Sequence, residues 1–213
     1  MICVALQENN VEKCLQILNT VELAEIRIDL AKLSETDVAK IFSNSPTKLI
    51  ATCRPDNYSD DARMKLLKTA ISSGAAYVDI EIESENSFTE EMVLFAKRHE
   101  TTVIISYHNY ENTPSSAELN AIIQKCFELG ADIAKIATLV IASRDNARLL
   151  ALYDTSRKVI VLGMGQIGKM TRVMAPFLGS PFTFAALTDT LATAPGQITA
   201  ENLKSAQTFF SAL

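Results

Sequence analysis

The sequence has few cysteines and no pairing pattern among them. Cys3, Cys14, Cys53 and Cys126 are scattered through 213 residues without any Cys-x-x-Cys spacing, and each has apolar neighbours. This usage argues against a disulfide framework and against a zinc motif, and it predicts buried free thiols. We therefore expect the protein to work in a reducing compartment, the cytoplasm.

Long apolar runs and clusters of basic charge are also missing. No apolar stretch approaches the roughly 18 residues of a membrane-spanning helix, and the opening MICVALQENN has no basic region before its short apolar segment. We interpret residues 2–6 as a first strand rather than a secretory signal, and we expect no membrane partner. The net charge of −5, without a basic run, argues against nucleic acid as the main partner.

No linker or low-complexity stretch divides the chain. Hydrophobic residues make up 48% of it and charged residues 21%, a composition that can bury a large core. A chain of 213 residues also lies within the range of one α/β barrel domain. We predict a single domain over residues 1–213.

Short segments rich in β-branched residues alternate eight times with amphipathic segments. The predicted strands are 2–6, 23–30, 48–54, 77–82, 102–108, 133–138, 158–163 and 181–187. Between them apolar residues recur at helical spacing, and Gly74 and Gly130 stand where two helices should end. Eight such units predict a single-domain (β/α)8 barrel. An open doubly wound sheet is the alternative that strand counting leaves open.

Polar residues at a spacing of two favour the barrel, because side chains two apart on a strand share a face. Such polar sets occur in three of the predicted strands: Glu25, Arg27 and Asp29; Asp79 and Glu81; Ser106 and His108. An open parallel sheet buries both faces against helices, whereas a barrel can enclose a charged pocket. The alternative is a structural ion-pair network. We expect Asp29, Asp79 and Glu81 to act as supporting residues.

One lysine lies among apolar residues in the predicted strand 133–138. Lys135 is flanked by Ala134 and Ile136, and an ammonium group is costly to bury, so this side chain needs a partner or a function. Burial favours the neutral amine, which is the nucleophile that forms Schiff bases with ketones. The alternative is a lysine at a strand end that extends to water.

Arg54 and His108 are predicted at the ends of two other strands, where the catalytic face of a barrel lies. The second histidine, His99, is at a helix end in a charged sequence and is predicted to be on the surface. A lone histidine is often a core residue. Because Lys135 is predicted at the end of the neighbouring strand, we interpret His108 as a candidate acid–base group.

The seventh strand is followed by Gly163, Gly165 and Gly168 in a G-x-G-x-x-G pattern. A dinucleotide site usually places this pattern in the first βαβ unit, so we favour a glycine-rich loop that lets Arg172 reach an anion. The segment Thr193-Ala-Pro-Gly-Gln197 is a polar turn after the last strand, on the same face. The alternative interpretation of this segment is an ordinary loop, since Pro-Gly is common in turns of any kind.

Taken together, these motifs resemble the type I 3-dehydroquinate dehydratase family of the shikimate pathway, from the second strand to the C-terminus. The resemblance rests on Glu25-Ile-Arg27-Ile-Asp29, Thr52-Cys-Arg54, Ser106-Tyr-His108, Lys135, Met164-Gly-Gln-Ile-Gly-Lys-Met-Thr-Arg172, Gly179-Ser, Phe182-Thr-Phe and Ala194-Pro-Gly-Gln197. Each motif alone is weak, but their order and spacing together are specific.

The resemblance implies a Schiff-base mechanism without a metal or cofactor. Lys135 resembles the lysine that condenses with the ketone of 3-dehydroquinate, and His108 resembles the acid–base group that moves the protons. The residues that would bind the substrate are Glu25, Arg27, Arg54, Arg172, Thr193 (usually serine in the family) and Gln197. Relatives are often dimers, so we expect a homodimer.

The chain departs from the family pattern after Arg54. The family usually has Glu-Gly-Gly there, and its glutamate hydrogen-bonds the catalytic histidine, whereas Tyr58 is four positions after Arg54 in this chain. We hypothesise that Asp60 or Asp61 orients His108 instead. Two further alternatives are another Schiff-base barrel of the class I aldolase type and a non-catalytic relative that binds a cyclic hydroxy acid.

Overall fold

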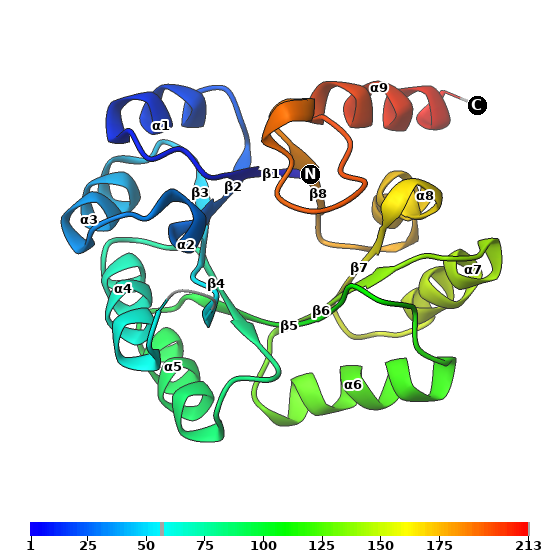
Figure 1. Ribbon diagram of the computed structural model, residues 1–213, viewed down its shortest axis with the longest axis horizontal. Helices are drawn as coiled ribbons and strands as arrows, with labels where there is room; N and C mark the ends of the chain where they lie inside the picture. Colours follow the sequence, from blue (N-terminus) through cyan, green and yellow to red (C-terminus); the bar gives the residue numbers. More distant parts are fainter. Residues whose placement is uncertain (56–57, 213) are drawn as a thin grey trace.

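The computed structural model describes residues 1–55 and 58–212, and it has eight parallel strands inside a ring of helices (Figure 1). Asp56 and Asn57, in the segment after Arg54, lie outside the described residues, as does Leu213. The strands are β1 Ile2–Leu6, β2 Leu23–Arg27, β3 Lys48–Thr52, β4 Tyr77–Glu81, β5 Thr102–Asn109, β6 Ile133–Leu139, β7 Val159–Met164 and β8 Thr183–Ala186.

The strands form one sheet in the order β7-β6-β5-β4-β3-β2-β1-β8. From β1 to β7 each strand pairs in parallel with the next one in the sequence, and β8 pairs in parallel with β1. The sheet therefore curls round until β7 and β8 face each other (Figure 1). This topology confirms the predicted (β/α)8 barrel and excludes the open doubly wound sheet, whose strand order reverses at a switch point.

Helices follow the strands and cover the outside of the barrel (Figure 1). They are α1 Val11–Leu18, α2 Ile28–Ala31, α3 Glu35–Asn44, α4 Asp60–Ser72, α5 Asn86–Arg98, α6 Ser116–Glu128, α7 Ser143–Leu150, α8 Gly165–Met174 and α9 Ala200–Ser211, with 3-10 turns η2 Ala151–Tyr153, η3 Ala175–Leu178 and η4 Asp189–Leu191. Gly74 and Gly130 follow α4 and α6 at φ +104° and +98°, as predicted for helix ends.

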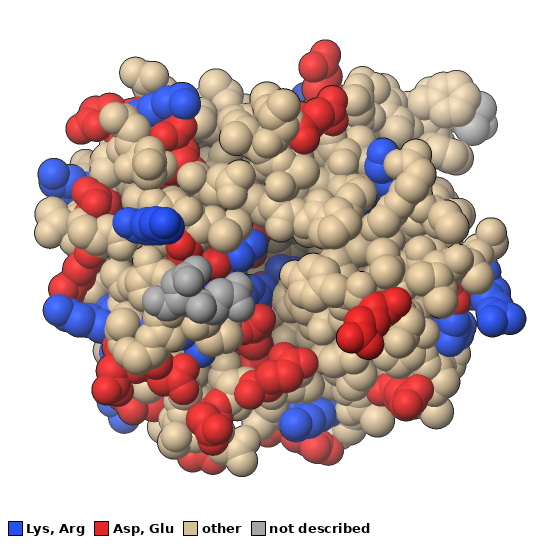
Figure 2. Space-filling model, viewed as in Figure 1, with Lys and Arg blue, Asp and Glu red and all other residues tan. Residues whose placement is uncertain are grey.

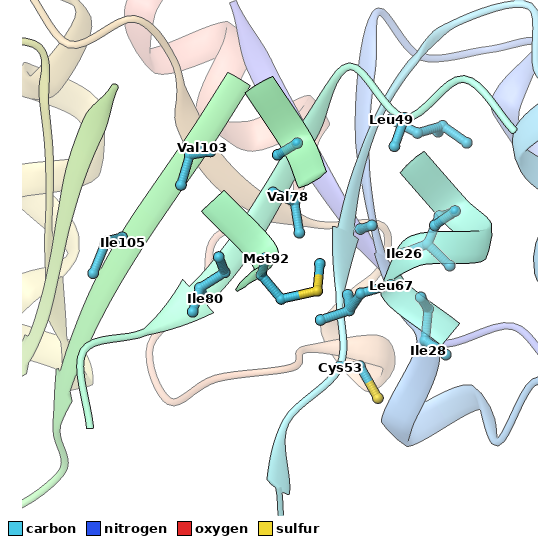
Figure 3. Packing of buried hydrophobic residues seen from close by; sticks show 14 of the residues in the cluster. Ile26, Ile28, Leu49, Cys53, Leu67, Val78, Ile80, Met92, Val103 and Ile105 are labelled. Carbon is cyan, nitrogen blue, oxygen red and sulfur yellow. The ribbon is translucent and has the colours of Figure 1, made fainter. Parts of the chain in front are cut away.

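The main core lies between the strands and the helices (Figure 3). Val78 and Ile80 of β4 and Val103 and Ile105 of β5 alternate with the polar residues of these strands and pack outward, with Met92 of α5 among them. A second cluster fills the barrel interior: Cys3, Leu23, Ile50, Ile104, Ile133, Ala137, Ile160, Leu162, Phe182 and Phe184. The interior is therefore apolar in part, and the polar residues gather beyond this layer.

The second predicted strand is too long by three residues. It ends at Arg27, and the short helix α2 begins at Ile28, so Asp29 is not on a strand face with Glu25 and Arg27. The reason is local, because the Asp29 carboxylate accepts two hydrogen bonds from Arg27, at 3.0 and 2.6 Å, and the chain turns to make them. Lys32 closes the turn at φ +52°.

Several other strand boundaries differ from prediction by one or two residues, and two of these differences bear on the site. β3 ends at Thr52, so Arg54 stands two residues beyond its strand rather than at its end. Lys135 is the third residue of β6, which continues to Leu139, and it pairs in register with Ser106 rather than with His108. Lys135 consequently lies deeper in the barrel than predicted.

None of the helices in residues 1–55 and 58–212 is both long enough and apolar enough to cross a membrane.

Candidate active site

A pocket opens at the carboxyl ends of the strands, and Figure 2 shows it as a hollow near the centre of this face with basic side chains inside it. The space between its walls is about 710 Å³ when the part open to solvent is included. The pocket is lined by Glu25, Arg27, Arg54, Glu81, His108, Tyr110, Lys135, Ala137, Leu162, Met164, Arg172, Phe184, Thr193, Ala194 and Gln197. Eight of the ten residues predicted for the site are among them.

Lys135 is buried in this pocket, with 4% of its surface exposed, so it does not extend to water as the alternative interpretation required. Its Nζ donates a hydrogen bond to Asp79 Oδ2 at 2.8 Å and lies 3.7 Å from Glu25 Oε1. The same nitrogen is 4.2 Å from the centroid of the Phe184 ring. The buried ammonium group is therefore held by two carboxylates and an aromatic face.

Asp79 joins Lys135 to Arg54. Its Oδ1 accepts a hydrogen bond from Ser106 Oγ at 2.6 Å and lies 3.2 Å from Arg54 Nη2. Arg54 also donates to Ser106 Oγ at 3.1 Å and pairs with Glu81 at 3.2 Å. Burial alone would raise the pKa of Asp79, but Arg54, Lys135 and His108 hold the pKa of this carboxyl well below its usual range.

His108 lies beside this network. Its Nε2 is 3.5 Å from Arg54 Nη2, and its ring lies 6.3 Å from that of Tyr110 and nearly parallel to it. Burial first, and then the nearby charges of Arg54 and Lys135, hold the pKa of His108 well below its ordinary value. The imidazole is thus neutral at neutral pH and can accept a proton.

Neither carboxylate proposed to orient His108 has a described contact with it. Asp60 and Asp61 open helix α4, and Asp60 Oδ1 pairs with Arg63 at 2.7 Å. Arg63 is buried and donates in addition to the Cys53 carbonyl oxygen at 3.0 Å. Among the residues that the structure describes, His108 Nδ1 is buried without a hydrogen-bond partner. No described contact supports the orienting role of Asp60 or Asp61.

Arg172 is the most unusual charge of the pocket, because its side chain is 1% exposed. It donates to the Phe184 carbonyl oxygen at 3.2 Å, but within the described part of the chain it pairs with no carboxylate and its Nε has no partner. Burial lowers the pKa of Arg172 to about 10. A buried guanidinium group without an anion predicts an anionic ligand.

The glycine pattern positions this arginine rather than a nucleotide. A Cβ on Gly168 would lie 2.5 Å from the Gly163 carbonyl carbon, so helix α8 begins almost in contact with the end of β7. Likewise, a Cβ on Gly196 would lie 2.4 Å from the Gly165 carbonyl oxygen, which draws the loop after β8 against α8. The three glycines of the motif thus serve close backbone packing, and α8 carries Arg172 into the pocket.

The loop after β8 contributes Thr193 and Gln197. Gln197 Oε1 accepts from the Thr193 backbone N–H at 2.7 Å, and Gln197 Nε2 donates to Thr193 Oγ1 at 3.1 Å. Elsewhere in the lining, Glu25 accepts from Thr52 Oγ1 at 2.9 Å, and Arg27 is held by Asp29. These four of the six predicted binding residues therefore have hydrogen-bond partners that hold their side chains at the pocket wall.

Sequence reasoning missed Phe184 and Tyr110 as pocket residues and treated Glu81 only as a support. The signal for Tyr110 was available, because it lies two positions after His108 on the same face. Phe184 alternates with outward residues in β8, but an aromatic residue at such a position is usually core. In the described residues no group of three or more His, Cys, Asp or Glu side chains could hold a metal ion.

The fold and pocket together are those of a (β/α)8-barrel enzyme that holds a buried lysine, a neutral histidine and a cluster of arginines in one small pocket. A family model described as Type I 3-dehydroquinase matches residues 2–213. The chain belongs to the type I 3-dehydroquinase family.

Individual relatives agree with this assignment over nearly the whole chain. The 3-dehydroquinate dehydratase of Methanocaldococcus jannaschii is 36% identical, with 96% of each chain covered. Among solved structures, the type I 3-dehydroquinate dehydratase of Clostridium difficile, carrying covalently modified comenic acid, matches with a TM-score of 0.87 at 26% identity, over 100% of this chain and 92% of that one. The Aquifex aeolicus enzyme gives a TM-score of 0.83 at 26% identity, over 99% and 98%.

Proposed function

We propose that this chain dehydrates 3-dehydroquinate to 3-dehydroshikimate through a Schiff base on Lys135, with His108 as the acid–base group. One observation carries the proposal: a single pocket is lined by a buried lysine, by a histidine whose pKa is lowered by burial and nearby charges, and by an arginine that pairs with no carboxylate in the described residues. Membership of the type I 3-dehydroquinase family supplies the substrate. The reaction is that of a hydro-lyase in the shikimate pathway.

The first half of the reaction creates an electron sink. Lys135 attacks the ketone carbon as the free amine, after its ammonium group has given one proton to a neighbouring base. That proton and one from the nitrogen leave with the ketone oxygen as water, so the imine keeps one N–H and a positive charge. The adjacent C–H bond becomes acidic because its electron pair can move to the imine nitrogen. His108, neutral at neutral pH because of its lowered pKa, accepts that proton.

The second half expels the hydroxyl group. The enamine electrons return, the C–O bond breaks, and the proton held by His108 leaves with the oxygen as water. A second molecule of water then hydrolyses the imine and frees Lys135. One water is released and one consumed at the imine, so the net change is the loss of a single water from the substrate.

The remaining residues bind the ring. Arg172 would pair with the substrate carboxylate, since a planar guanidinium matches two carboxylate oxygens and this one has no anion in the described structure. Thr193 and Gln197 would hydrogen-bond the same end of the substrate, and Glu25, Arg27 and Arg54 would bind its hydroxyl groups. An orienting role for Asp60 or Asp61 would require their side chains to leave the present positions.

The direct test is the appearance of the conjugated enone product, followed by ultraviolet absorbance. The wild-type chain should convert 3-dehydroquinate, and Lys135→Met, which keeps an apolar stem of similar length, should lose the activity while keeping its fold by circular dichroism. Full activity of Lys135→Met would remove the Schiff-base mechanism. A folded but inactive wild-type chain that still binds the substrate would favour the non-catalytic alternative.

A class I aldolase of another kind is the remaining enzymatic alternative. Such an enzyme would cleave a C–C bond and would usually bind a phosphate or an open polyol. Product analysis by mass separates the two, because dehydration removes the mass of one water and an aldol cleavage yields two fragments.

Two statements about the whole protein belong to the proposal as well. We take the chain to be a homodimer, as its relatives often are, and a sedimentation mass equal to that of one chain would end this idea. We take it to work in the cytoplasm, where its four free and buried cysteines would remain reduced. Cell fractionation with an antibody to the chain tests this location.

A further inference from the structure

Two groups that lie close to the nitrogen of Lys135 have no role in the Schiff-base mechanism described above. Asp79 Oδ2 lies 2.8 Å from Nζ, and the Phe184 ring centroid lies 4.2 Å from it. Both neighbours are buried, with side-chain exposure of 0% for Asp79. We call the Asp79 carboxylate and the Phe184 ring the cation cradle.

We infer that the cation cradle is the counter-ion site of the protonated imine, and that it keeps the imine protonated throughout the reaction. The inference rests on the proposed Schiff-base function, because it assigns a partner to the intermediate on Lys135. It makes Asp79 a catalytic group, since the carboxylate touches the reacting nitrogen.

The charge on this nitrogen changes during the reaction, and the balance shows where the cradle acts. Imine formation makes a C–N bond, releases the ketone oxygen as water and leaves one N–H and a positive charge on the nitrogen. Proton transfer to His108 moves an electron pair onto the nitrogen and cancels that charge. Loss of the hydroxyl group as water returns the charge. The imine is thus cationic before and after dehydration, and each time its N–H can donate to Asp79 Oδ2.

The surroundings of Asp79 fit this task. Ser106 and Arg54 hold its Oδ1, so that Oδ2 is left for the lysine nitrogen. The low pKa of Asp79 keeps the carboxylate ionised over the whole working range of pH. An aromatic face adds attraction for a cation without taking a proton.

Other titratable and charged groups also lie around this nitrogen and its partners. None of them is substituted in the variants proposed below, so they do not account for a difference between those variants and wild type. They are Glu25 and Arg27 of β2, Arg54 after β3, Glu81 of β4, His108 of β5, and the Cys3 thiol of β1. Arg172 enters the same pocket from α8. Glu25 is farther from Nζ than Asp79 is, at 3.7 Å against 2.8 Å, so Asp79 dominates.

The test is the pH dependence of imine trapping by cyanoborohydride, which reduces a protonated imine but not a neutral one. In Asp79→Asn with 3-dehydroquinate, the adduct on Lys135 should disappear at a pH lower than in wild type by roughly one to three units. The alkaline limb of kcat should move in the same direction. Phe184→Leu keeps an apolar side chain and should give a smaller shift of the same sign.

Ser106→Ala is the matched comparison, because it removes one hydrogen bond to Asp79 but no charge, and Arg54 still lies beside Oδ1. Its trapping midpoint should therefore move less than that of Asp79→Asn. An Asp79→Asn variant with a uniform loss of activity and an unchanged midpoint would overturn the inference. If Asp79→Asn does not fold, an unchanged midpoint in Phe184→Leu overturns the cradle. Absence of any adduct in wild type would instead refute the Schiff-base function.

Discussion

At the scale of single residues, the site is defined by charged side chains that are buried close to one another. Lys135, Asp79 and Arg172 are 4%, 2% and 1% exposed. Buried charges destabilise a protein unless they are paired, and two of these three are paired with each other. Within the described residues the third, Arg172, donates only to a carbonyl oxygen, so its charge is available to an anionic ligand.

Replacement of Arg172 by methionine tests this interpretation, because it should separate stability from binding. We expect Arg172→Met to raise the free energy of unfolding without substrate by about 1–3 kcal/mol, since a buried unpaired cation is removed. KM should rise roughly 10- to 150-fold, the equivalent of a charged hydrogen bond. Urea denaturation and steady-state kinetics measure the two effects.

Arg172→Lys is the control. It keeps the charge and should give no gain in the free energy of unfolding. An Arg172→Met variant that is destabilised and has an unchanged KM would contradict this interpretation of Arg172.

His108 should matter for proton transfer more than for imine formation. In His108→Gln, kcat should fall by roughly 10²- to 10⁴-fold, the usual contribution of a general acid–base group. The Lys135 adduct should still form on borohydride reduction, because the amine is intact. Rapid-quench kinetics and intact mass measure the two. Loss of the adduct together with the activity would assign His108 a role in imine formation instead.

The lowered pKa of His108 has a second consequence, for stability. Between the folded pKa and the ordinary value near 6.5, the unfolded chain binds this proton and the folded chain does not. The free energy of unfolding should therefore fall as the pH is lowered through that window. Urea titrations at several pH values should show a shallower dependence in His108→Gln than in wild type. Identical slopes would mean that His108 titrates normally in the folded chain.

At the scale of elements, close backbone contacts place helix α8 and the loop after β8 against the pocket. Gly163 meets Gly168, and Gly165 meets Gly196, at separations where a Cβ does not fit. This packing gives the G-x-G-x-x-G pattern a structural role that needs no nucleotide. The sequence predicted a glycine-rich loop that lets Arg172 reach an anion, but it did not show that the glycines serve close backbone contacts.

Gly168→Ala tests the element-scale account, with Gly179→Ala as its control. A Cβ at Gly168 would force α8 away from β7, and we expect a loss of about 1–3 kcal/mol of unfolding free energy together with a raised KM, because Arg172 moves with the helix. A Cβ at Gly179 would meet no atom within 4 Å, but φ there is +99°, so alanine should cost stability without changing KM. A raised KM in both variants would contradict the specific role of the α8 contact.

Some features of the elements could be predicted from the sequence and others could not. Alternation at spacing two located Glu25, Asp79 and Ser106 inside the barrel, because the strand period is unambiguous. The end of β2 could not be located, since the Arg27–Asp29 pair that turns the chain satisfies the same spacing as a strand face.

At the scale of the whole molecule, the barrel gathers residues from seven different strand–helix units into one pocket. Alternating strands and helices predicted this closure, and the barrel is confirmed. The depth of Lys135 was not predictable, because strand tilt and register decide how far along the interior a given residue lies. Pairing across the barrel, such as Lys135 with Asp79, depends on that depth and appears only in three dimensions.

The measurement that tests the central claim most directly is borohydride reduction of the wild-type chain, with and without 3-dehydroquinate, read by intact mass and peptide mapping. The account predicts one substrate-dependent adduct per chain, located on Lys135 and absent in Lys135→Met. Folded protein that turns over the substrate without such an adduct, or an adduct on another lysine, would contradict it.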